Sequence, residues 1–204
     1  MHTILLTGSN GLLGQKIIYV LCHKKNVTLI ATSKGNNRTA KKDGYVYEPL
    51  DITDEKALSD IISKYKPTSI INTAAMTNVD ACETDKENCR RMNVDAVKYL
   101  TDQCKIHNIH FIHLSTDFVF DGEAGPYKEE DKPNPLSYYA WSKLESEKIA
   151  ENSGIDYAIL RTIIIYGVVD DEQRSNVVLW TKNSLEQKKH ITVITDQFRS
   201  PTLA

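Results

Sequence analysis

The stretch Thr7-Gly8-Ser9-Asn10-Gly11-Leu12-Leu13-Gly14 decides the fold that this sequence predicts. It stands between a short apolar run and an amphipathic segment, so it marks the turn from a strand into a helix. Glycines at this spacing permit a tight turn, a close approach of the backbone to a pyrophosphate, and close packing of the helix on the sheet. The free N–H groups at the start of the helix also attract phosphate. We therefore expect residues 8–14 to bind a dinucleotide; the alternative is three turn glycines without a ligand.

Outside this stretch, β-branched runs of strand length alternate with segments of helical spacing. The runs lie at residues 3–7, 27–32, 45–50, 69–73, 110–114 and 157–160. The helical segments lie at residues 12–21, 58–62 and 92–104. This alternation predicts an α/β fold whose doubly wound, mostly parallel sheet is covered on both faces. We assign residues 1–160 to a Rossmann-type domain that binds NAD(P), and residues 161–204 to the start of a smaller C-terminal substrate lobe.

The composition is that of an ordinary globular protein. Its 204 residues are 41% hydrophobic and 25% charged, and the formal net charge of −2 is close to neutral. Because the basic pairs are scattered rather than massed, we expect no nucleic-acid partner. No apolar run approaches the ~18 residues of a membrane span, and the spacing of the four cysteines fits neither a zinc site nor a disulfide scaffold. We expect a soluble, cytoplasmic protein.

The end of the second predicted strand indicates which nicotinamide cofactor is preferred. An acidic residue at this point would bond the ribose 2′-hydroxyl and repel a 2′-phosphate. Residues 31–38 instead contain no acid and two cations, Lys34 and Arg38, beside Ser33. We expect these three residues to contact the cofactor and to favour NADPH, with NADH as a second possibility. The alternative is that both cations are solvated loop charges.

Tyr139 and Lys143 form the candidate proton-handling pair. They are four residues apart in a segment of helix-forming composition, so they share one face. For a phenol of pKa ~10 to exchange protons near neutral pH, its anion must be stabilised by about 4 kcal/mol. One ammonium ~5 Å away supplies about 3 kcal/mol at an effective dielectric constant of ~20. Such a pair also occurs by chance on helix surfaces, and its context decides between the two readings.

That context is a hydroxyl at the end of the strand that precedes the pair. Thr116 follows the run at residues 110–114, and a long loop rich in Gly, Pro and acids covers residues 117–135. In parallel sheets, ligands bind at the carboxyl ends of the strands. Thr116 could then polarise a carbonyl while Tyr139 donates a proton and the cofactor delivers hydride.

These segments resemble the extended short-chain dehydrogenase/reductase superfamily, and within it the dTDP-4-dehydrorhamnose reductase family. The stretches at residues 72–83 and 115–122 are the most specific for this branch. The remaining matches span nearly the whole chain and lie at residues 7–14, 70–71, 93, 126–127, 130–131, 139–143, 161–162, 166–167, 196–197 and 201–202.

The resemblance implies roles for particular residues. The catalytic triad would be Thr116, Tyr139 and Lys143. Further cofactor contacts would come from Asp51, Ile52, Ala74, Ala75 and Thr77. Contacts to the sugar nucleotide would come from Asp117, Val119, Asn176 and Arg199. The family's reaction reduces the 4-keto group of dTDP-4-dehydro-6-deoxy-L-mannose to give dTDP-L-rhamnose, a precursor of cell-surface polysaccharide. We therefore expect a dTDP-sugar as the partner, and a homodimer is compatible with the family.

Two departures from the family pattern limit this expectation. Residues 163–165 are three isoleucines where the family often has an aromatic residue, so the identity of the sugar stays open. The family also continues beyond the point that corresponds to Ala204, so we expect the substrate lobe to be partial. Neither the string of His107, His110 and His113 nor the single carboxylate of Glu83 makes a metal site, and no metal is expected.

Two other functions remain open. One is a sugar-nucleotide epimerase or dehydratase, although dehydratases carry a glutamate where this chain has Phe118. The other is a non-catalytic NADP-binding subunit, such as the regulatory subunit of methionine adenosyltransferase, which shares the expected fold. The intact set of Thr116, Tyr139 and Lys143 weighs against a protein that only binds.

Overall fold

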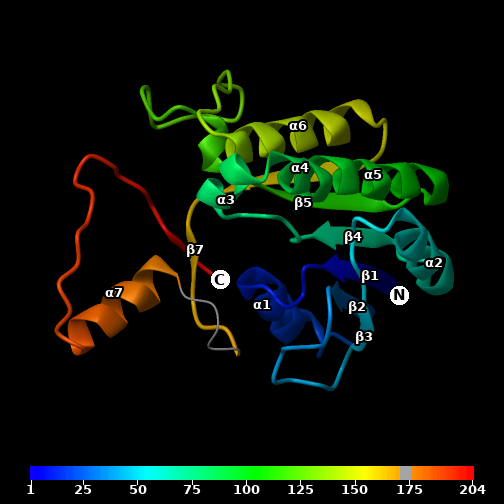
Figure 1. Cartoon of the computed structure of the whole chain (residues 1–204). Helices are drawn as coiled ribbons and strands as arrows, with labels where there is room; N and C mark the ends of the chain where they lie inside the picture. Colours follow the sequence, from blue (N-terminus) through cyan, green and yellow to red (C-terminus); the bar gives the residue numbers. More distant parts are fainter. Residues whose placement is uncertain (171–175) are drawn as a thin grey trace.

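A single parallel sheet forms the centre of the protein (Figure 1). The computed structural model describes residues 1–170 and 176–204. The sheet has six strands in the order β3-β2-β1-β4-β5-β6, each pair parallel. Its strands are β1 (His2–Thr7), β2 (Val27–Ser33), β3 (Val46–Pro49), β4 (Ser69–Asn72), β5 (His110–Thr116) and β6 (Tyr157–Thr162). All six predicted strands are therefore confirmed, as is the α/β class.

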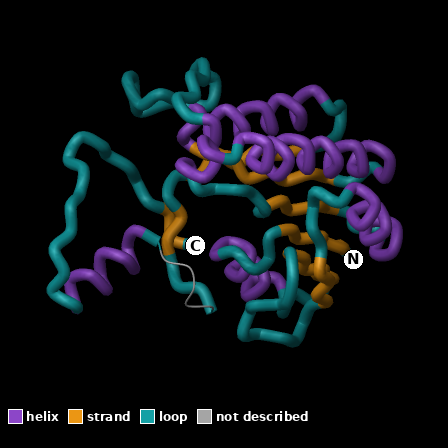
Figure 2. The backbone as a smooth tube through the Cα atoms, in the orientation of Figure 1, coloured by secondary structure: helices purple, strands orange, loops and turns teal. Residues whose placement is uncertain are grey.

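Helices connect these strands and cover both faces of the sheet (Figure 2). The α-helices are α1 (Leu12–Leu21), α2 (Glu55–Tyr65), α3 (Val79–Thr84), α4 (Lys86–Arg90), α5 (Ala96–His107), α6 (Tyr138–Asn152) and α7 (Val177–Glu186). A π-helical turn, η1 (Arg91–Asp95), joins α4 to α5, and a 3-10 turn, η2 (Asp117–Val119), follows β5. The first two segments of helical spacing lie in α1 and α2, and the third spans η1 and α5. The predicted long loop begins with η2.

Two apolar clusters hold the layers together. Leu6, Leu29 and Ala31 point to one face of the sheet and pack against Ile18 of α1. The opposite face carries the larger cluster, which α2, α5 and α6 share with buried strand residues such as Phe111. On the face opposite α6, by contrast, Leu160 of the edge strand β6 is 49% exposed.

The direction in which successive strands are added to the sheet reverses between β1 and β4. From β1 the chain crosses to β2 on one side, and β4 pairs with β1 on the other, so the turns at their carboxyl ends diverge. In open parallel sheets this is the position of the ligand crevice. Gly8 lies here with φ of +72°, and a Cβ at this residue would come within 2.6 Å of the Ala74 nitrogen. A Cβ on Gly14 would lie 2.5 Å from the carbonyl oxygen of Gly8.

The last part of the chain adds a small second sheet. It consists of β7 (Ile165–Tyr166) and β8 (Thr202–Leu203), which pair in parallel, and α7 stands beside it (Figure 1). The domain boundary at residue 160 stays a prediction. Among the described residues, the helices are too short or too polar to cross a membrane.

Two glycines with similar φ angles, Gly8 and Gly35, test how far the fold depends on the close approach of the turn after β1 to the end of β4. Gly8→Ala should destabilise the protein by about 1–2 kcal/mol through its positive φ and by a further ~1–3 kcal/mol through the clash with Ala74. Gly35→Ala is the matched control, since Gly35 has φ of +78° and open space around its Cα. Chemical denaturation of both variants measures the difference, and equal losses of stability would contradict the proposed steric role of Gly8.

Candidate active site

The three candidate catalytic residues come from neighbouring elements at the carboxyl edge of the sheet. Thr116 ends β5, and Tyr139 and Lys143 lie one turn apart at the start of α6, as the spacing predicted. Two hydrogen bonds fix the start of α6: the Ser137 hydroxyl accepts from the Ala140 nitrogen at 3.2 Å, and the Glu83 carboxylate accepts from the Tyr138 nitrogen at 2.6 Å. Glu83 thus caps the helix that carries the pair.

Tyr139 is a protonated phenol rather than a phenolate in this structure. Burial raises the pKa of Tyr139 to about 12, and a hydrogen bond with Thr116 opposes the rise only in part. The ring lies edge-on to Phe118, with centroids 6.0 Å apart. The expected lowering of the phenol pKa by Lys143 is absent here, because the lysine amine has another partner.

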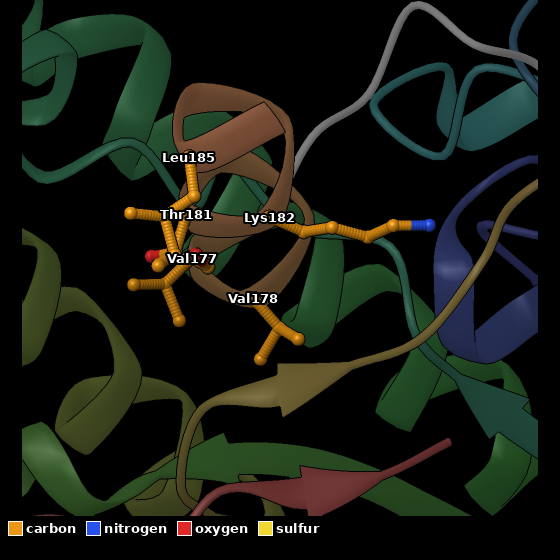
Figure 3. A pocket seen from close by; sticks show the side chains of 5 residues that line it. All are labelled: Val177, Val178, Thr181, Lys182 and Leu185. Atoms are coloured by element: carbon orange, nitrogen blue, oxygen red, sulfur yellow. Dashed lines mark hydrogen bonds between the residues drawn. The ribbon is translucent and has the colours of Figure 1, made fainter. Parts of the chain in front are cut away.

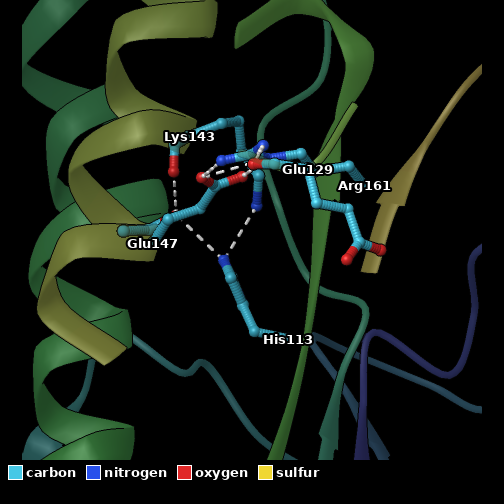
Figure 4. A network of polar contacts seen from close by, with 6 residues as sticks. His113, Glu129, Lys143, Glu147 and Arg161 are labelled. Atoms are coloured by element: carbon cyan, nitrogen blue, oxygen red, sulfur yellow. Dashed lines mark hydrogen bonds and ion pairs between the residues drawn. The ribbon is translucent and has the colours of Figure 1, made fainter. Parts of the chain in front are cut away.

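That partner of Lys143 is His113 on β5 (Figure 4). The lysine Nζ lies 3.2 Å from the histidine Nε2, and Lys143 is only 3% exposed. Burial lowers the pKa of the amine to about 8, and the charge of Glu147 opposes the change. Lys143 therefore titrates much closer to neutral pH than an exposed lysine does.

A buried ion pair ties α6 to the edge strand and to the long loop. Glu147 is 1% exposed, and its carboxylate accepts from Arg161 Nε at 3.0 Å and Nη2 at 2.8 Å. The same guanidinium donates to the Glu129 carbonyl oxygen at 3.1 Å and lies 5.2 Å from the centre of the Phe120 ring. Arg161 thus links α6, β6 and the loop at residues 117–135.

The glycine-rich turn is fixed to the neighbouring strands. The Ser9 nitrogen donates to the Thr32 carbonyl oxygen at 3.0 Å, and the Gly11 nitrogen donates to the Gly8 carbonyl oxygen at 2.9 Å. Gly11 precedes α1 without a side chain to cap it, and the first turn, which starts with Leu12 and Leu13, contains no acidic residue. The close approach of the backbone and the uncapped helix start fit a bound pyrophosphate.

Asn10 joins this turn to the loop that follows β2. Its amide nitrogen donates to the Asn36 carbonyl oxygen at 2.9 Å, and its amide oxygen accepts from the Arg38 nitrogen at 2.9 Å. Ser33 ends β2, and its carbonyl oxygen accepts from Leu50. The structure therefore brings the expected phosphate loop and the expected cofactor-selecting loop together.

Lys34 is paired with an acid that the sequence did not predict as its partner. Its Nζ lies 2.8 Å from the Asp51 carboxylate. Burial acts to raise the pKa of Asp51, but hydrogen bonds from Lys34 and Thr53 outweigh it and lower the pKa to about 2. Ile52, the next residue, is buried. Lys34 and Asp51, both expected to line the cofactor, thus meet in one ion pair.

The segment after β4 holds the remaining expected cofactor residues, Ala74, Ala75 and Thr77. Its shape depends on Asn93, which lies in the π-helical turn and bonds both the nitrogen and the carbonyl oxygen of Met76, at 2.8 and 2.9 Å. The Asn93 amide also donates to the Ser142 hydroxyl of α6 at 3.0 Å. π-helical turns are frequent at functional sites, and no periodicity in the sequence predicted this one.

The four expected substrate residues do not all meet. Arg199 pairs with Asp117 at 3.0 Å and lies 4.3 Å from the centre of the Phe118 ring, next to Thr116 and Tyr139. Val119, in contrast, is fully buried. Asn176 caps α7 by accepting from the Leu179 nitrogen and donates to the Gly167 carbonyl oxygen. The roles of all four stay predictions.

Other surface features contribute little to this site. A shallow hollow on α7, to which Val177, Val178 and Leu185 contribute (Figure 3), contains none of the predicted site residues. Within residues 1–170 and 176–204, no group of three His, Cys, Asp or Glu side chains could hold a metal ion.

Comparisons with known proteins identify relatives of the whole chain. The family profile described as RmlD substrate binding domain matches residues 1–204. The dTDP-4-dehydrorhamnose reductase of Aggregatibacter actinomycetemcomitans is 32% identical over 203 residues, 99% of this chain and 63% of that protein. Methionine adenosyltransferase 2 subunit beta of Bos taurus is 33% identical over 176 residues, 86% of this chain and 51% of that protein.

One similar protein of known structure was solved with its cofactor bound. The structure of dTDP-4-dehydrorhamnose reductase from Bacillus anthracis in complex with NADP is 25% identical, with a TM-score of 0.80, and the match covers 99% of this chain and 66% of that one. This chain thus spans between half and two thirds of the length of these three relatives.

The buried pair of Glu147 and Arg161 gives a stability prediction. Glu147→Gln should destabilise the protein by about 3–5 kcal/mol, because it leaves the guanidinium without its counter-charge. Glu145→Gln on the same helix is the control, since Glu145 pairs with Lys148 at the surface, and it should cost less than ~1 kcal/mol. Urea denaturation measures both variants, and a small loss in Glu147→Gln would show that the buried pair does not hold α6.

Proposed function

Because this chain belongs to the family of the RmlD substrate binding domain, we propose that it forms the cofactor-binding part of an NADPH-dependent sugar-nucleotide reductase. The proposed reaction reduces the 4-keto group of a dTDP-sugar, with dTDP-4-dehydrorhamnose as substrate and dTDP-L-rhamnose as product. One observation carries the proposal: a half-buried, protonated tyrosine stands beside a strand-end threonine and the Asp117–Arg199 pair, at the edge where the glycine-rich turn lies.

The fit of a dinucleotide rests on this chain's own residues. Gly8 and Gly14 leave no room for side chains, so the backbone of the turn can reach the pyrophosphate, and the start of α1 offers N–H groups to it. Lys34 and Arg38 lie on the loop that Asn10 holds against this turn. When bound, NADPH supplies the hydride for the carbonyl carbon.

The side chains then manage the proton. Tyr139 donates its hydroxyl proton to the carbonyl oxygen as that oxygen gains negative charge, and Thr116 stabilises the same oxygen by a hydrogen bond. The raised pKa of Tyr139 keeps the phenol protonated before the reaction. Proton donation leaves a phenolate, and an ammonium on Lys143 stabilises that anion. Arg199, already beside the site, supplies a cation of the kind that binds diphosphates.

A second function has one specific observation in its favour. Methionine adenosyltransferase 2 subunit beta is 33% identical to this chain and the reductase 32%, although the match to the subunit covers 86% of the chain and the match to the reductase 99%. A binding subunit of that kind would take up the cofactor without turnover. No comparable observation favours an epimerase or a dehydratase. A dehydratase is also disfavoured because this chain has Phe118 where dehydratases carry a glutamate.

Cofactor choice is tested at the loop after β2. The double variant Lys34→Ala, Arg38→Ala should bind NADPH at least tenfold more weakly, since each charge-assisted hydrogen bond contributes about 1.5–3 kcal/mol before discounting for solvent. Its affinity for NADH should change little. Titration calorimetry with both cofactors measures this, with Lys56→Ala, a surface lysine paired with Asp60, as the control. An unchanged preference for NADPH would refute the assignment.

Turnover is tested at Tyr139. With NADPH and dTDP-4-dehydro-6-deoxy-L-mannose, the protein should consume reduced nicotinamide in proportion to product, and Tyr139→Phe should lower kcat by at least ~100-fold. Tyr138→Phe is the matched control and should keep its activity, since the Tyr138 ring lies tilted against Trp141, with centroids 4.8 Å apart. Tight cofactor binding without turnover in the unmodified protein would instead support the binding-subunit function.

A further inference from the structure

His113 is a buried polar residue that the sequence analysis considered only as a metal ligand and discounted. It is 1% exposed, and its ring stacks on Phe111 beneath α6. Three polar atoms surround the ring: Asn72 Nδ2 lies 3.2 Å from Nδ1, and Ser146 Oγ and Lys143 Nζ lie 2.9 and 3.2 Å from Nε2. Figure 4 shows His113 pointing from β5 toward α6 and Lys143.

The neighbours of Asn72 determine which nitrogen of His113 carries the proton. The Asn72 amide oxygen accepts from the Thr7 hydroxyl at 2.6 Å and from the Ala74 nitrogen at 3.3 Å, so its NH₂ group faces the histidine. Nδ1 of His113 is therefore an acceptor. Burial and the neighbouring Lys143 hold the pKa of His113 well below its usual value, so the ring is neutral and its proton lies on Nε2.

A proton on Nε2 suits only one charge state of Lys143. The Ser146 hydroxyl donates to the Lys143 carbonyl oxygen at 2.6 Å and can accept from Nε2. A neutral lysine amine can also accept a hydrogen bond from Nε2–H. A lysine ammonium cannot, because it has only donors and would face a second donor at Nε2. The charged lysine instead requires Nε2 as an acceptor, which moves the histidine proton to Nδ1. The Asn72 amide must then turn its oxygen to the histidine, and it gives up the long bond of 3.3 Å that it accepts from the Ala74 nitrogen.

We propose that His113 is a positioning residue for the proposed reductase function: it holds the Lys143 amine beneath α6, and its tautomer changes with the charge of that amine. Asn72 extends the connection to Thr7 and Ala74, which flank the glycine-rich turn and its partner segment. The charge of Lys143, which would stabilise the phenolate of Tyr139, is thereby coupled to the backbone that would hold the cofactor.

The other groups around Lys143 do not replace this contact. The charge of Glu147 on α6 and that of Cys89 on α4 act on Lys143, and Tyr139 lies one turn before it on α6. The carboxylate of Glu147 forms an ion pair with Arg161 of β6. Burial raises the pKa of Tyr139, and the Cys89 thiol bonds Ser142. His113 is thus the group that meets the lysine amine directly among the hydrogen bonds of the described residues.

Two substitutions separate the contact from mere packing. His113→Asn can keep the bond to Asn72 but does not reach Lys143, whereas His113→Gln places an amide oxygen within reach of the amine. Without an acceptor, the buried ammonium is less stable, so the pKa of Lys143 falls and activity is lost at lower pH. We expect the alkaline limb of the kcat profile to move down by at least about one pH unit in His113→Asn, a tenfold change in proton affinity, and to recover in His113→Gln.

A spectroscopic experiment on the unsubstituted protein tests the proposal without requiring turnover or a variant that folds. Two-bond ¹H–¹⁵N spectra of the histidine-labelled protein report which ring nitrogen of His113 is protonated. From about pH 6 to pH 10 the protonated nitrogen should change from Nδ1 to Nε2 as Lys143 loses its charge. One unchanging tautomer, or an alkaline limb that both variants leave in place, would overturn the proposal. Absence of reductase activity would refute the proposed function alone, because the spectra remain decisive for His113.

Discussion

Burial of ionisable groups between β5 and α6 is the constraint on which the site depends. His113, Lys143 and Glu147 are each no more than 3% exposed. A charge in such a place is stable only when it is paired or when its pKa shifts. The charge of Glu147 is paired with Arg161, whereas Lys143 has a lowered pKa. Both contacts are possible only when α6 is oriented about its axis with Lys143 and Glu147 facing inward. This orientation of the helix also fixes where Tyr139 points.

The same constraint explains why the tyrosine and the lysine do not act on one another in this structure. The spacing of four residues places both on one face of α6, but the lysine side chain reaches inward to β5 and the tyrosine ring lies against Phe118 at the rim. The phenol therefore keeps the raised pKa of a buried tyrosine. The phenol is therefore protonated, as the proposed proton donor must be. Its raised pKa also makes proton loss harder, so in the proposed reaction a cation would be needed to stabilise the phenolate.

Local patterns predicted the parts of the molecule that local physics determines. The β-branched runs gave six strands, and the glycine spacing placed a tight turn between β1 and α1. Long-range partners were not predictable in this way. The Lys34–Asp51 pair depends on how β2 and β3 lie side by side, and the Asp117–Arg199 pair joins residues 82 positions apart. His113 was set aside because the three spaced histidines cannot converge on a metal. Its actual partner lies on a helix that only the fold brings to it.

The cost of burying Lys143 bears on the choice between an enzyme and a binding subunit. Desolvation of this amine is reflected in its lowered pKa, and a buried apolar residue of similar length would avoid that penalty. Proteins carry such destabilising groups chiefly where a reaction requires them. A subunit that only bound a cofactor would gain nothing from a titrating amine placed beneath the helix that carries Tyr139. The burial of this amine therefore supports the proposed reductase rather than a subunit that only binds a cofactor.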